Sequence, residues 1–229
     1  MQGKLLLHEE IVLLALRDDK GTFSGSYCIY AIAGAMISEL LLQERIAVND
    51  DRNRIVAVVN GDPTGDDLLD GFLQEILESP KPRGLQDWVN RAARIKRLAH
   101  RIAEKLSGMG ILKHDEQKIL WVFSRQLYPE LDGTPEDAIR ARMAAVMFDA
   151  HREPDERTAV LIALASHAGL LKANFVPEEL RQHRQRVKQL ASGEILAAGA
   201  TQQAIAAVQT AVMVAVMIPA IVAASSASS

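Results

Sequence analysis

Apolar residues recur at helical spacing from the start of the chain. In "LLLHEEIVLLALRDDKGTF", Leu7, Ile11 and Leu14 repeat every three or four residues, which predicts a helix that ends before "DDKG". Gly21 suits a helix C-cap or the turn that follows it. The segment "SYCIYAIAGAMISELLLQERI" predicts a second helix, whose small residues let a neighbour pack closely.

A second pattern, a helix followed by two short apolar runs around a polar turn, recurs along the chain. In "AVNDDRNRIVAVVN" an apolar pair, an acidic turn and a β-branched run predict a hairpin. In "HRIAEKLSGMGILKHDEQKILWVFS" the same pattern predicts strands at Ile111–Leu112 and Ile119–Phe123, with "KHDEQ" as the turn. "AVLIALASHAGLLKANFV" is a shorter third copy. We therefore expect a mainly α fold, one globular helical domain over residues 1–229 with small β-hairpins resembling winged-helix repeats.

The chain ends in the apolar run "QTAVMVAVMIPAIVAASSASS", for which three interpretations stay open. A buried or interface helix is favoured over a membrane-resting helix, and a spanning helix is least favoured. A span needs about 20 predominantly apolar residues; this run contains Pro219 and has no flanking Lys or Arg to set orientation. We expect an apolar C-terminal helix over about 204–224 and a frayed tail at 225–229.

Composition and charge limit the kinds of partner and the cellular compartment that we expect for this protein. Hydrophobic residues make up 48% and aromatic residues 4% of the chain, and the net charge is −3. Any attraction to anionic lipid or nucleic acid must therefore come from a local patch. The single cysteine, Cys28, excludes an internal disulfide. Glu9 and Glu10 interrupt the start where a signal peptide needs an apolar stretch, so we expect a cytoplasmic protein.

One such patch lies in "DWVNRAARIKRLAHRIAEKL", which predicts a single strongly basic amphipathic helix. Its core stripe is Trp88, Ala92, Ile95, Ala99, Ile102 and Leu106. Its basic face is Arg94, Arg97, Arg101 and Lys105, joined by Lys96 and Arg91. A solvated charged face, a lipid-headgroup surface and a nucleic-acid surface all fit this pattern. The candidate headgroup residues are Arg94, Lys96, Arg97 and Arg101.

Acidic and histidine-containing motifs give little support for catalysis. "DDLLD" (Asp66, Asp67 and Asp70) has the spacing of a magnesium motif, but it follows a turn, so Asp66 and Asp67 are predicted to cap a helix. "HEE" and "HREPDER" lack the paired histidines of a zinc helix; His8 is predicted to be a packed or rim histidine, and Arg157 to pair with its acidic neighbours. We expect no enzyme activity, no catalytic residue, no metal and no cofactor.

Five segments together carry a family resemblance. "LLLHEEIVLLALRDDKGT", "AGAMISELLLQERI", "DPTGDDLLD", "RIAEKLSGMGIL" and "PDERTAVLIALASHAGLL" occur in the order seen in Golgi phosphoprotein 3-like domains. The resemblance covers about Leu5 to Val176. It implies a mainly helical domain that attaches peripherally to membranes, binds phosphatidylinositol 4-phosphate and holds the tails of client proteins. It also implies an oligomerisation hairpin, here about Lys118 to Tyr128, with Ile119, Trp121 and Phe123 as its candidate residues.

The resemblance weakens where the family binds its lipid. Ser24 stands in place of a tryptophan, Ala33 in place of an arginine, and Lys96 and Ala99 in place of two more arginines. Lysine cannot make the bidentate fork that arginine makes to phosphate, so the family's phosphoinositide pocket is largely missing. The alanine-rich style and the lack of a basic N-terminal extension indicate a bacterial relative.

The leading hypothesis is a non-enzymatic peripheral membrane or adaptor protein on the cytoplasmic face of a membrane. Its expected partners are anionic lipid, a protein client and further copies of itself. One alternative is a winged-helix-like nucleic-acid-binding protein, which the acidic wing turns "NDDRNR" and "HDEQK" disfavour. Another is an oligomeric scaffold that binds no lipid.

Overall fold

The computed structural model describes residues 4–17, 21–23, 28–49, 54–119, 123–195 and 204–205, with only the backbone for residues 17, 117–119 and 123–125. The helices are α1 (Leu7–Ala15), α2 (Cys28–Leu42), α3 (Asp67–Leu77), α4 (Leu85–Ala93), α5 (Leu98–Gly108), α6 (Thr134–Met147), α7 (Glu156–His167), α8 (Leu171–Asn174), α9 (Pro177–Gln182) and α10 (Arg184–Ser192). The strands are β1 (Leu16–Arg17), β2 (Thr22–Phe23), β3 (Ile46–Val48), β4 (Ile55–Val58), β5 (Arg83–Gly84), β6 (Asp115–Ile119) and β7 (Phe123–Leu127). The mainly α fold with small antiparallel strand pairs is confirmed.

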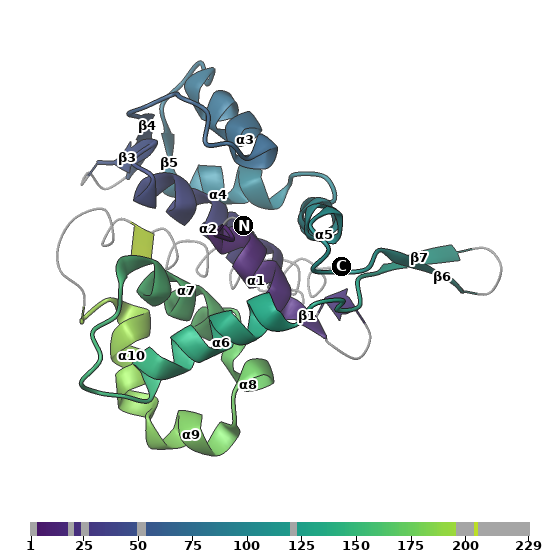
Figure 1. The fold of residues 1–229 in the computed structure, drawn as a ribbon. Coiled ribbons are helices and arrows are strands. Elements are labelled where there is room, and N and C mark those ends of the chain that lie inside the picture. Colours follow the sequence, from purple (N-terminus) through teal and green to yellow (C-terminus); the bar gives the residue numbers. More distant parts are fainter. Residues whose placement is uncertain are drawn as a thin grey trace, which may run out of the picture.

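The core is organised around α1, which lies at the centre of the molecule (Figure 1). Every residue of α1 is buried. It packs against α2, α5, α6 and α7, and α2 in turn packs against α4 and α7. Its apolar residues pack on these neighbours, and its polar residues His8, Glu9 and Glu10 are buried with them.

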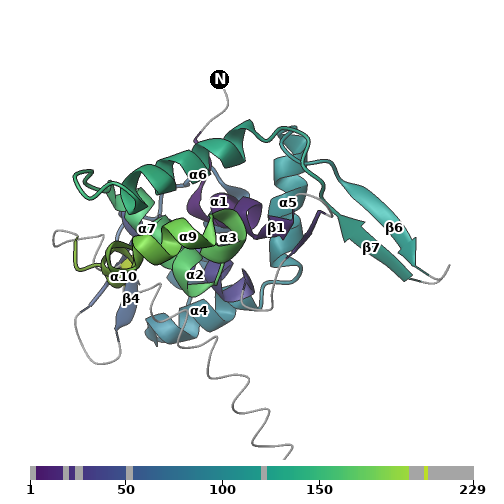
Figure 2. The ribbon, with the colours of Figure 1, turned by 90° about the horizontal axis from the view of Figure 1, so that it is seen from below.

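Within the described residues, three small antiparallel sheets lie around this helical body. β1 pairs with β2, β3–β4–β5 form a three-stranded sheet, and β6 pairs with β7. The predicted hairpin from "AVNDDRNRIVAVVN" is confirmed, with Ile46 opposite Val58. The β6–β7 hairpin extends away from the body in two perpendicular views (Figures 1 and 2).

The structure corrects the two later copies of the hairpin pattern. The strands of the second hairpin are Asp115–Ile119 and Phe123–Leu127, so "DEQ" of the predicted turn "KHDEQ" belongs to a strand. Ile119 is paired with Phe123 at the end of this ladder. In the third copy, Leu171–Asn174 forms the short helix α8 and not a strand.

The predicted single basic helix is also wrong. α4 ends at Ala93, and α5 begins at Leu98 after Arg97 adopts a left-handed conformation with φ 57°. α4 packs on α2, whereas α5 packs on both α1 and α2. After the break, the apolar stripe of α5, which begins at Leu98, reaches α1 as well as α2.

Buried charge is neutralised between helices. Glu10 on α1 and Glu39 on α2 are each only 2% exposed. Arg157 on α7 lies 2.9 Å from a Glu39 oxygen, and its guanidinium also donates to the Leu5 carbonyl at 2.6 Å. Arg142 on α6 donates to Glu10 at 2.9 Å. The expectation that Arg157 pairs with its acidic neighbours in sequence is thus wrong.

The pKa values of the two carboxyl groups are shifted in opposite directions. Burial raises the pKa of Glu10 above its ordinary value, and Arg142 and Arg157 offset this only in part. Burial acts likewise on Glu39, but hydrogen bonding and charge from Arg157, with the Leu7 N–H, outweigh it and lower its pKa. Glu39 therefore stabilises the fold above its unfolded pKa, and this contribution is lost as the pH falls.

We expect Arg157→Met to destabilise the protein strongly near neutral pH. The substitution leaves the Glu39 carboxylate buried without a cation, which costs about 3–5 kcal/mol when one partner of a buried pair is removed. The deficit relative to wild type should shrink at acidic pH, since protonated Glu39 needs no cation. Urea unfolding at both pH values measures this. Arg152→Met, at an exposed arginine, is the control, and an equal loss in both variants would refute the interpretation.

We expect Gly21→Ala to weaken the attachment of the β6–β7 hairpin to the body. Gly21 has φ +56° and accepts a hydrogen bond from the Tyr128 N–H at 2.8 Å. A Cβ there would lie 2.3 Å from the Pro129 nitrogen. The left-handed backbone alone costs alanine about 1–2 kcal/mol. Gly110→Ala, with φ +78° and open space around the new Cβ, isolates that backbone cost. Unfolding free energies should therefore show a larger loss for Gly21→Ala.

Candidate functional site

The turn between α4 and α5 carries the candidate headgroup residues. Arg94, Lys96 and Arg97 lie in this turn and Arg101 lies on the first turn of α5, and all four are exposed. The partly buried Ile95 packs against the core and Leu98 is buried, so apolar side chains hold the segment from beneath. We call Arg94, Lys96, Arg97 and Arg101 the basic turn.

Only part of this positive charge is neutralised by the protein. Arg97 forms an exposed ion pair with Glu104 at 2.7 Å. Within the residues that the structure describes, Arg94, Lys96 and Arg101 form no ion pair. The basic turn therefore presents cations from two adjoining elements to solvent, although the continuous helix predicted for them is absent.

Lys105 does not belong to this outward face, contrary to the sequence-based prediction. Its ammonium lies 2.7 Å from Glu9 and 2.6 Å from Asp66, both buried carboxylates. Desolvation lowers the pKa of Lys105, but hydrogen bonds to the two carboxylates outweigh this and raise it. Arg91 likewise pairs with Glu75. One side of α5 thus supplies an internal cation, while Arg101 remains outside.

The resemblance assigns four positions to a lipid pocket, and among the three that the structure describes only Lys96 carries a charge. Ala33 on α2 is fully buried. Lys96 lies in the turn and Ala99 on α5, and Ser24 lies outside the described residues. Phe23, just before Ser24, contacts His100 with ring centroids 5.5 Å apart. The beginning of this loop therefore lies beside α5.

An aromatic cluster occupies this region. Phe23, His100, His114 and Tyr128 lie together, and the Tyr128 hydroxyl is 3.2 Å from His100 Nδ1. Burial and the nearby Arg97 charge lower the pKa of His100. Burial and the Glu104 charge raise the pKa of Tyr128. These rings join β2, α5 and the base of the β6–β7 hairpin. The sequence gives no periodic signal for the cluster, because its residues come from separate elements.

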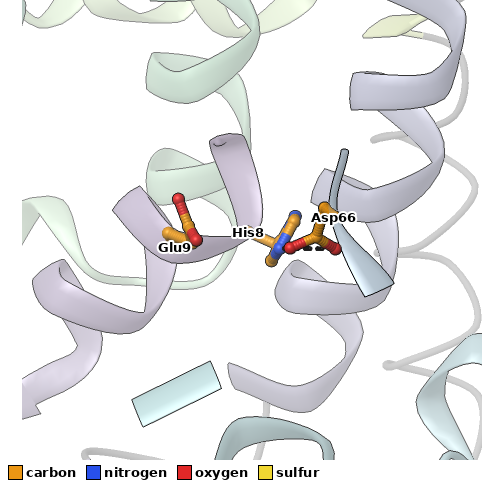
Figure 3. Close-up of side chains that lie close together, drawn as sticks. All are labelled: His8, Glu9 and Asp66. Atoms are coloured by element: carbon orange, nitrogen blue, oxygen red, sulfur yellow. Dashed lines mark ion pairs between the residues drawn. The ribbon is translucent and has the colours of Figure 1, made fainter. Parts of the chain in front are cut away.

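A second polar group lies beneath α5, where α1 meets the start of α3. Figure 3 shows the His8 ring facing the Asp66 carboxylate, with Glu9 on the adjoining position of α1. Glu9 accepts from the Leu6 N–H at 2.7 Å. Asp66 is the N-cap of α3 and accepts from the Leu69 N–H at 2.8 Å. The capping role predicted for Asp66 and the packed position predicted for His8 are both confirmed.

Two further acidic motif residues, Asp70 and Asp155, have structural contacts. Asp70 accepts from both the N–H and the hydroxyl of Thr64 at 2.6 Å. Asp155 caps α7 by accepting from the Thr158 N–H at 3.0 Å.

Of the hairpin candidates, Ile119 and Phe123 are described only through their backbone, and Trp121 lies outside the described residues.

Among the described residues, no helix combines the length and the apolar character needed to cross a bilayer. Ala204 and Ile205 are buried, and the Ser38 hydroxyl donates to the Ala204 carbonyl at 3.2 Å. The rest of the predicted C-terminal helix and the tail at 225–229 lie outside the described residues.

Comparison with known proteins identifies the family. The sequence matches the family described as Golgi phosphoprotein 3 (GPP34) over residues 7–208. It is 27% identical over 164 residues to vacuolar protein sorting-associated protein 74 of Eremothecium gossypii, covering 62% of this chain and 49% of that protein. It is 24% identical over 167 residues to the protein of the same name from Schizosaccharomyces pombe, covering 64% and 49%.

The chain spans about half the length of these curated relatives. The family match, in contrast, covers most of the chain, from the first residue of α1 to beyond α10. The resemblance carried by the five sequence segments is thereby confirmed, and the chain belongs to the Golgi phosphoprotein 3 family.

Proposed function

We propose that this protein is a non-enzymatic peripheral membrane adaptor that binds anionic lipid headgroups through the basic turn. The observation that carries the proposal is the exposure of Arg94, Lys96 and Arg101 without ion-pair partners among the described residues. Family membership supports an adaptor role at a membrane surface. The relatives' name, which refers to vacuolar protein sorting, supports a role in trafficking and a protein client.

The charge on the basic turn sets the expected strength of binding. Four cations and the paired Glu104 give a net local charge of about +3, whereas the whole chain carries −3. Each cation near an anionic leaflet contributes about 1 kcal/mol. The attraction is therefore local, weak and reversible, and salt should screen it within a Debye length.

The chemistry of the turn favours general anionic lipid over a single phosphoinositide. Arginine forms paired hydrogen bonds to a phosphate, but Lys96 offers only a point charge. Ala33 and Ala99 offer no charge at the two other family positions within the described residues. We therefore propose that surface charge density, not a 4-phosphate group, decides binding on the cytoplasmic face of a membrane.

We expect the combined variant Arg94→Gln, Lys96→Gln and Arg101→Gln to lose membrane binding. Removing three unpaired cations should lower the partition coefficient by about 100-fold, from about 1 kcal/mol each. Flotation with phosphatidylcholine vesicles, with and without phosphatidylserine, measures this at low salt. Arg97 stays in place because Glu104 already neutralises it.

The matched control removes the same charge elsewhere. Lys172, Arg184 and Lys188 are exposed on α8 and α10, and replacing all three by Gln should leave flotation nearly unchanged. A third set of vesicles carries phosphatidylinositol 4-phosphate at the same surface charge as the phosphatidylserine vesicles. Equal recovery with neutral and anionic vesicles would refute headgroup binding, and strong preference for the phosphoinositide would refute the charge-density interpretation.

We also propose that the β6–β7 hairpin supports self-association through Ile119, Trp121 and Phe123. A two-stranded hairpin that extends from the body is marginally stable in water without cover, and β6–β7 extends in this way (Figure 2). A second copy of the chain would cover it, in line with the family's oligomerisation hairpin. The partner surface is then the same segment, as in a two-fold symmetric dimer.

Shortening the hairpin should lower the molar mass of the assembly in solution. We expect a variant in which residues 117–125 are replaced by a two-residue Asn-Gly turn to elute as a monomer in light-scattering chromatography, while the wild type elutes as a larger species. Asn-Gly closure keeps Asp115 and Leu127 paired, which preserves the hairpin base. A wild-type monomer, or an unchanged mass in the shortened variant, would exclude this role.

A further inference from the structure

His8 is an unusual histidine because it is fully buried and has no hydrogen-bond partner among the described residues. Its exposed fraction is 0%, and neither ring nitrogen has a hydrogen-bond partner among the described residues. Its nearest charged neighbour is Asp66, with 3.8 Å between His8 Nε2 and Asp66 Oδ1, which is too long for a hydrogen bond. Buried polar groups are normally satisfied, so an unpartnered imidazole requires an explanation.

The donors around this ring match the ligand set of a transition-metal ion. His8 offers a nitrogen, Glu9 and Asp66 each offer a carboxylate oxygen, and these atoms lie within 4.8 Å of one another. Imidazole combined with carboxylate suits zinc and neighbouring divalent ions. Ligand atoms around tetrahedral zinc stand about 3.3 Å apart, so small side-chain rotations would close the site.

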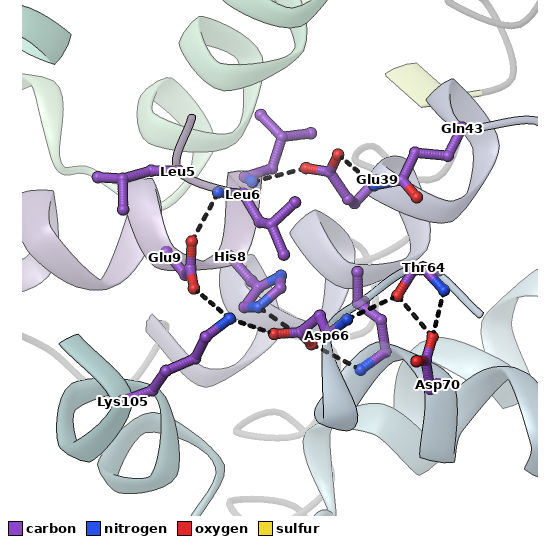
Figure 4. A network of polar contacts seen from close by, with 12 residues as sticks. Leu5, Leu6, His8, Glu9, Glu39, Gln43, Thr64, Asp66, Asp70 and Lys105 are labelled. Atoms are coloured by element: carbon purple, nitrogen blue, oxygen red, sulfur yellow. Dashed lines mark hydrogen bonds and ion pairs between the residues drawn. The ribbon is translucent and has the colours of Figure 1, made fainter. Parts of the chain in front are cut away.

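A cation already occupies the position between the two carboxylates. The Lys105 ammonium bridges Glu9 Oε1 at 2.7 Å and Asp66 Oδ2 at 2.6 Å, as Figure 4 shows. The Lys105 side chain is 44% exposed, so it reaches inward from the solvent side of the cluster. It can therefore leave by rotating outward, without unfolding α5.

A cavity provides the space for this exchange. It has a volume of about 280 Å³ and is lined by His8, Asp66, Arg101 and Lys105, among others. His8 and Asp66 thus line the same opening as the lysine that covers them. An ion entering here would meet the imidazole and the Asp66 carboxylate once the ammonium had withdrawn. Glu9 is not part of the lining, but its ligand oxygen lies within 4.8 Å of the other two ligand atoms, and the cavity could hold water at a fourth coordination position.

We propose that His8, Glu9 and Asp66 form a binding site for a divalent transition-metal ion such as Zn²⁺, and that Lys105 is a displaceable internal cation at this site. The ion would bridge α1 and the start of α3. Binding exchanges a single positive charge for a double one next to two carboxylates, so the ion and the ammonium compete. The proposal does not depend on lipid binding by the basic turn.

The test is titration of the full chain with Co²⁺, followed by visible absorption, and with Zn²⁺, followed by equilibrium dialysis. We expect one ion per chain, with the absorption of a low-coordinate Co²⁺ site. Lys105→Met should tighten binding at least about tenfold, because the competing ammonium is removed while the stem remains. His8→Leu should abolish metal binding at this site. The substitution removes no hydrogen bond from the described part of the fold.

Two further variants keep the experiment decisive. Asp66→Asn retains an N-cap acceptor for the Leu69 N–H but removes the charged ligand. This variant should therefore fold normally and yet bind the ion poorly, and it tests the site even if His8→Leu does not fold. His151→Gln removes an exposed histidine and should leave binding unchanged. The proposal is overturned by the absence of saturable binding in wild type and Lys105→Met, by unchanged affinity in Lys105→Met, or by equal losses in His151→Gln and Asp66→Asn.

Discussion

The arrangement of the helices depends on neutralising the carboxylates that α1 and α2 carry into the core. Two consecutive residues of α1, Glu9 and Glu10, are buried, and Glu39 faces them from α2. Each needs a cation, because an unpaired buried charge costs several kcal/mol. Those cations arrive from three different helices: Lys105 from α5, Arg142 from α6 and Arg157 from α7. Charge neutralisation and apolar burial thus specify the same packing around α1.

The same constraint separates the cations of α5 into an inner and an outer group. Lys105 turns inward to Glu9 and Asp66, while Leu98, Ile102 and Leu106 bury the apolar stripe. With these positions fixed, Arg101 faces solvent, and the turn that precedes α5 cannot fold back into the core. The outward charge of the basic turn is therefore what remains after the interior has taken the cations it needs, and this leaves it available for an external anion.

Local features could be predicted from the sequence, whereas long-range pairing could not. The stripe on α5, the cap at Asp66 and the β3–β4 hairpin all follow from short-range spacing and turn chemistry. Periodicity did not reveal the break at Arg97, because the stripes of α4 and α5 run nearly in register through it. Nor could it reveal the pair of Arg157 with Glu39 or the approach of His8 to Asp66, which join residues far apart in the chain. Acidic residues lie closer to Arg157 in the sequence than Glu39 does. Because Glu39 is buried, its carboxylate gains more from pairing with a cation.

The position of the hairpin beside α5 links the two proposals, weak headgroup binding and self-association. Tyr128 at the hairpin base contacts His100 on α5, and Arg101 is the next residue along that helix. In the proposed assembly, joining two chains through their hairpins would therefore hold two basic turns in one particle. Binding of the first turn raises the effective concentration of the second at the same surface, so avidity can exceed the affinity of either turn by about 10²–10⁴-fold. On these two proposals, a protein with a few exposed cations would gain a usable membrane affinity without a pocket for a particular headgroup.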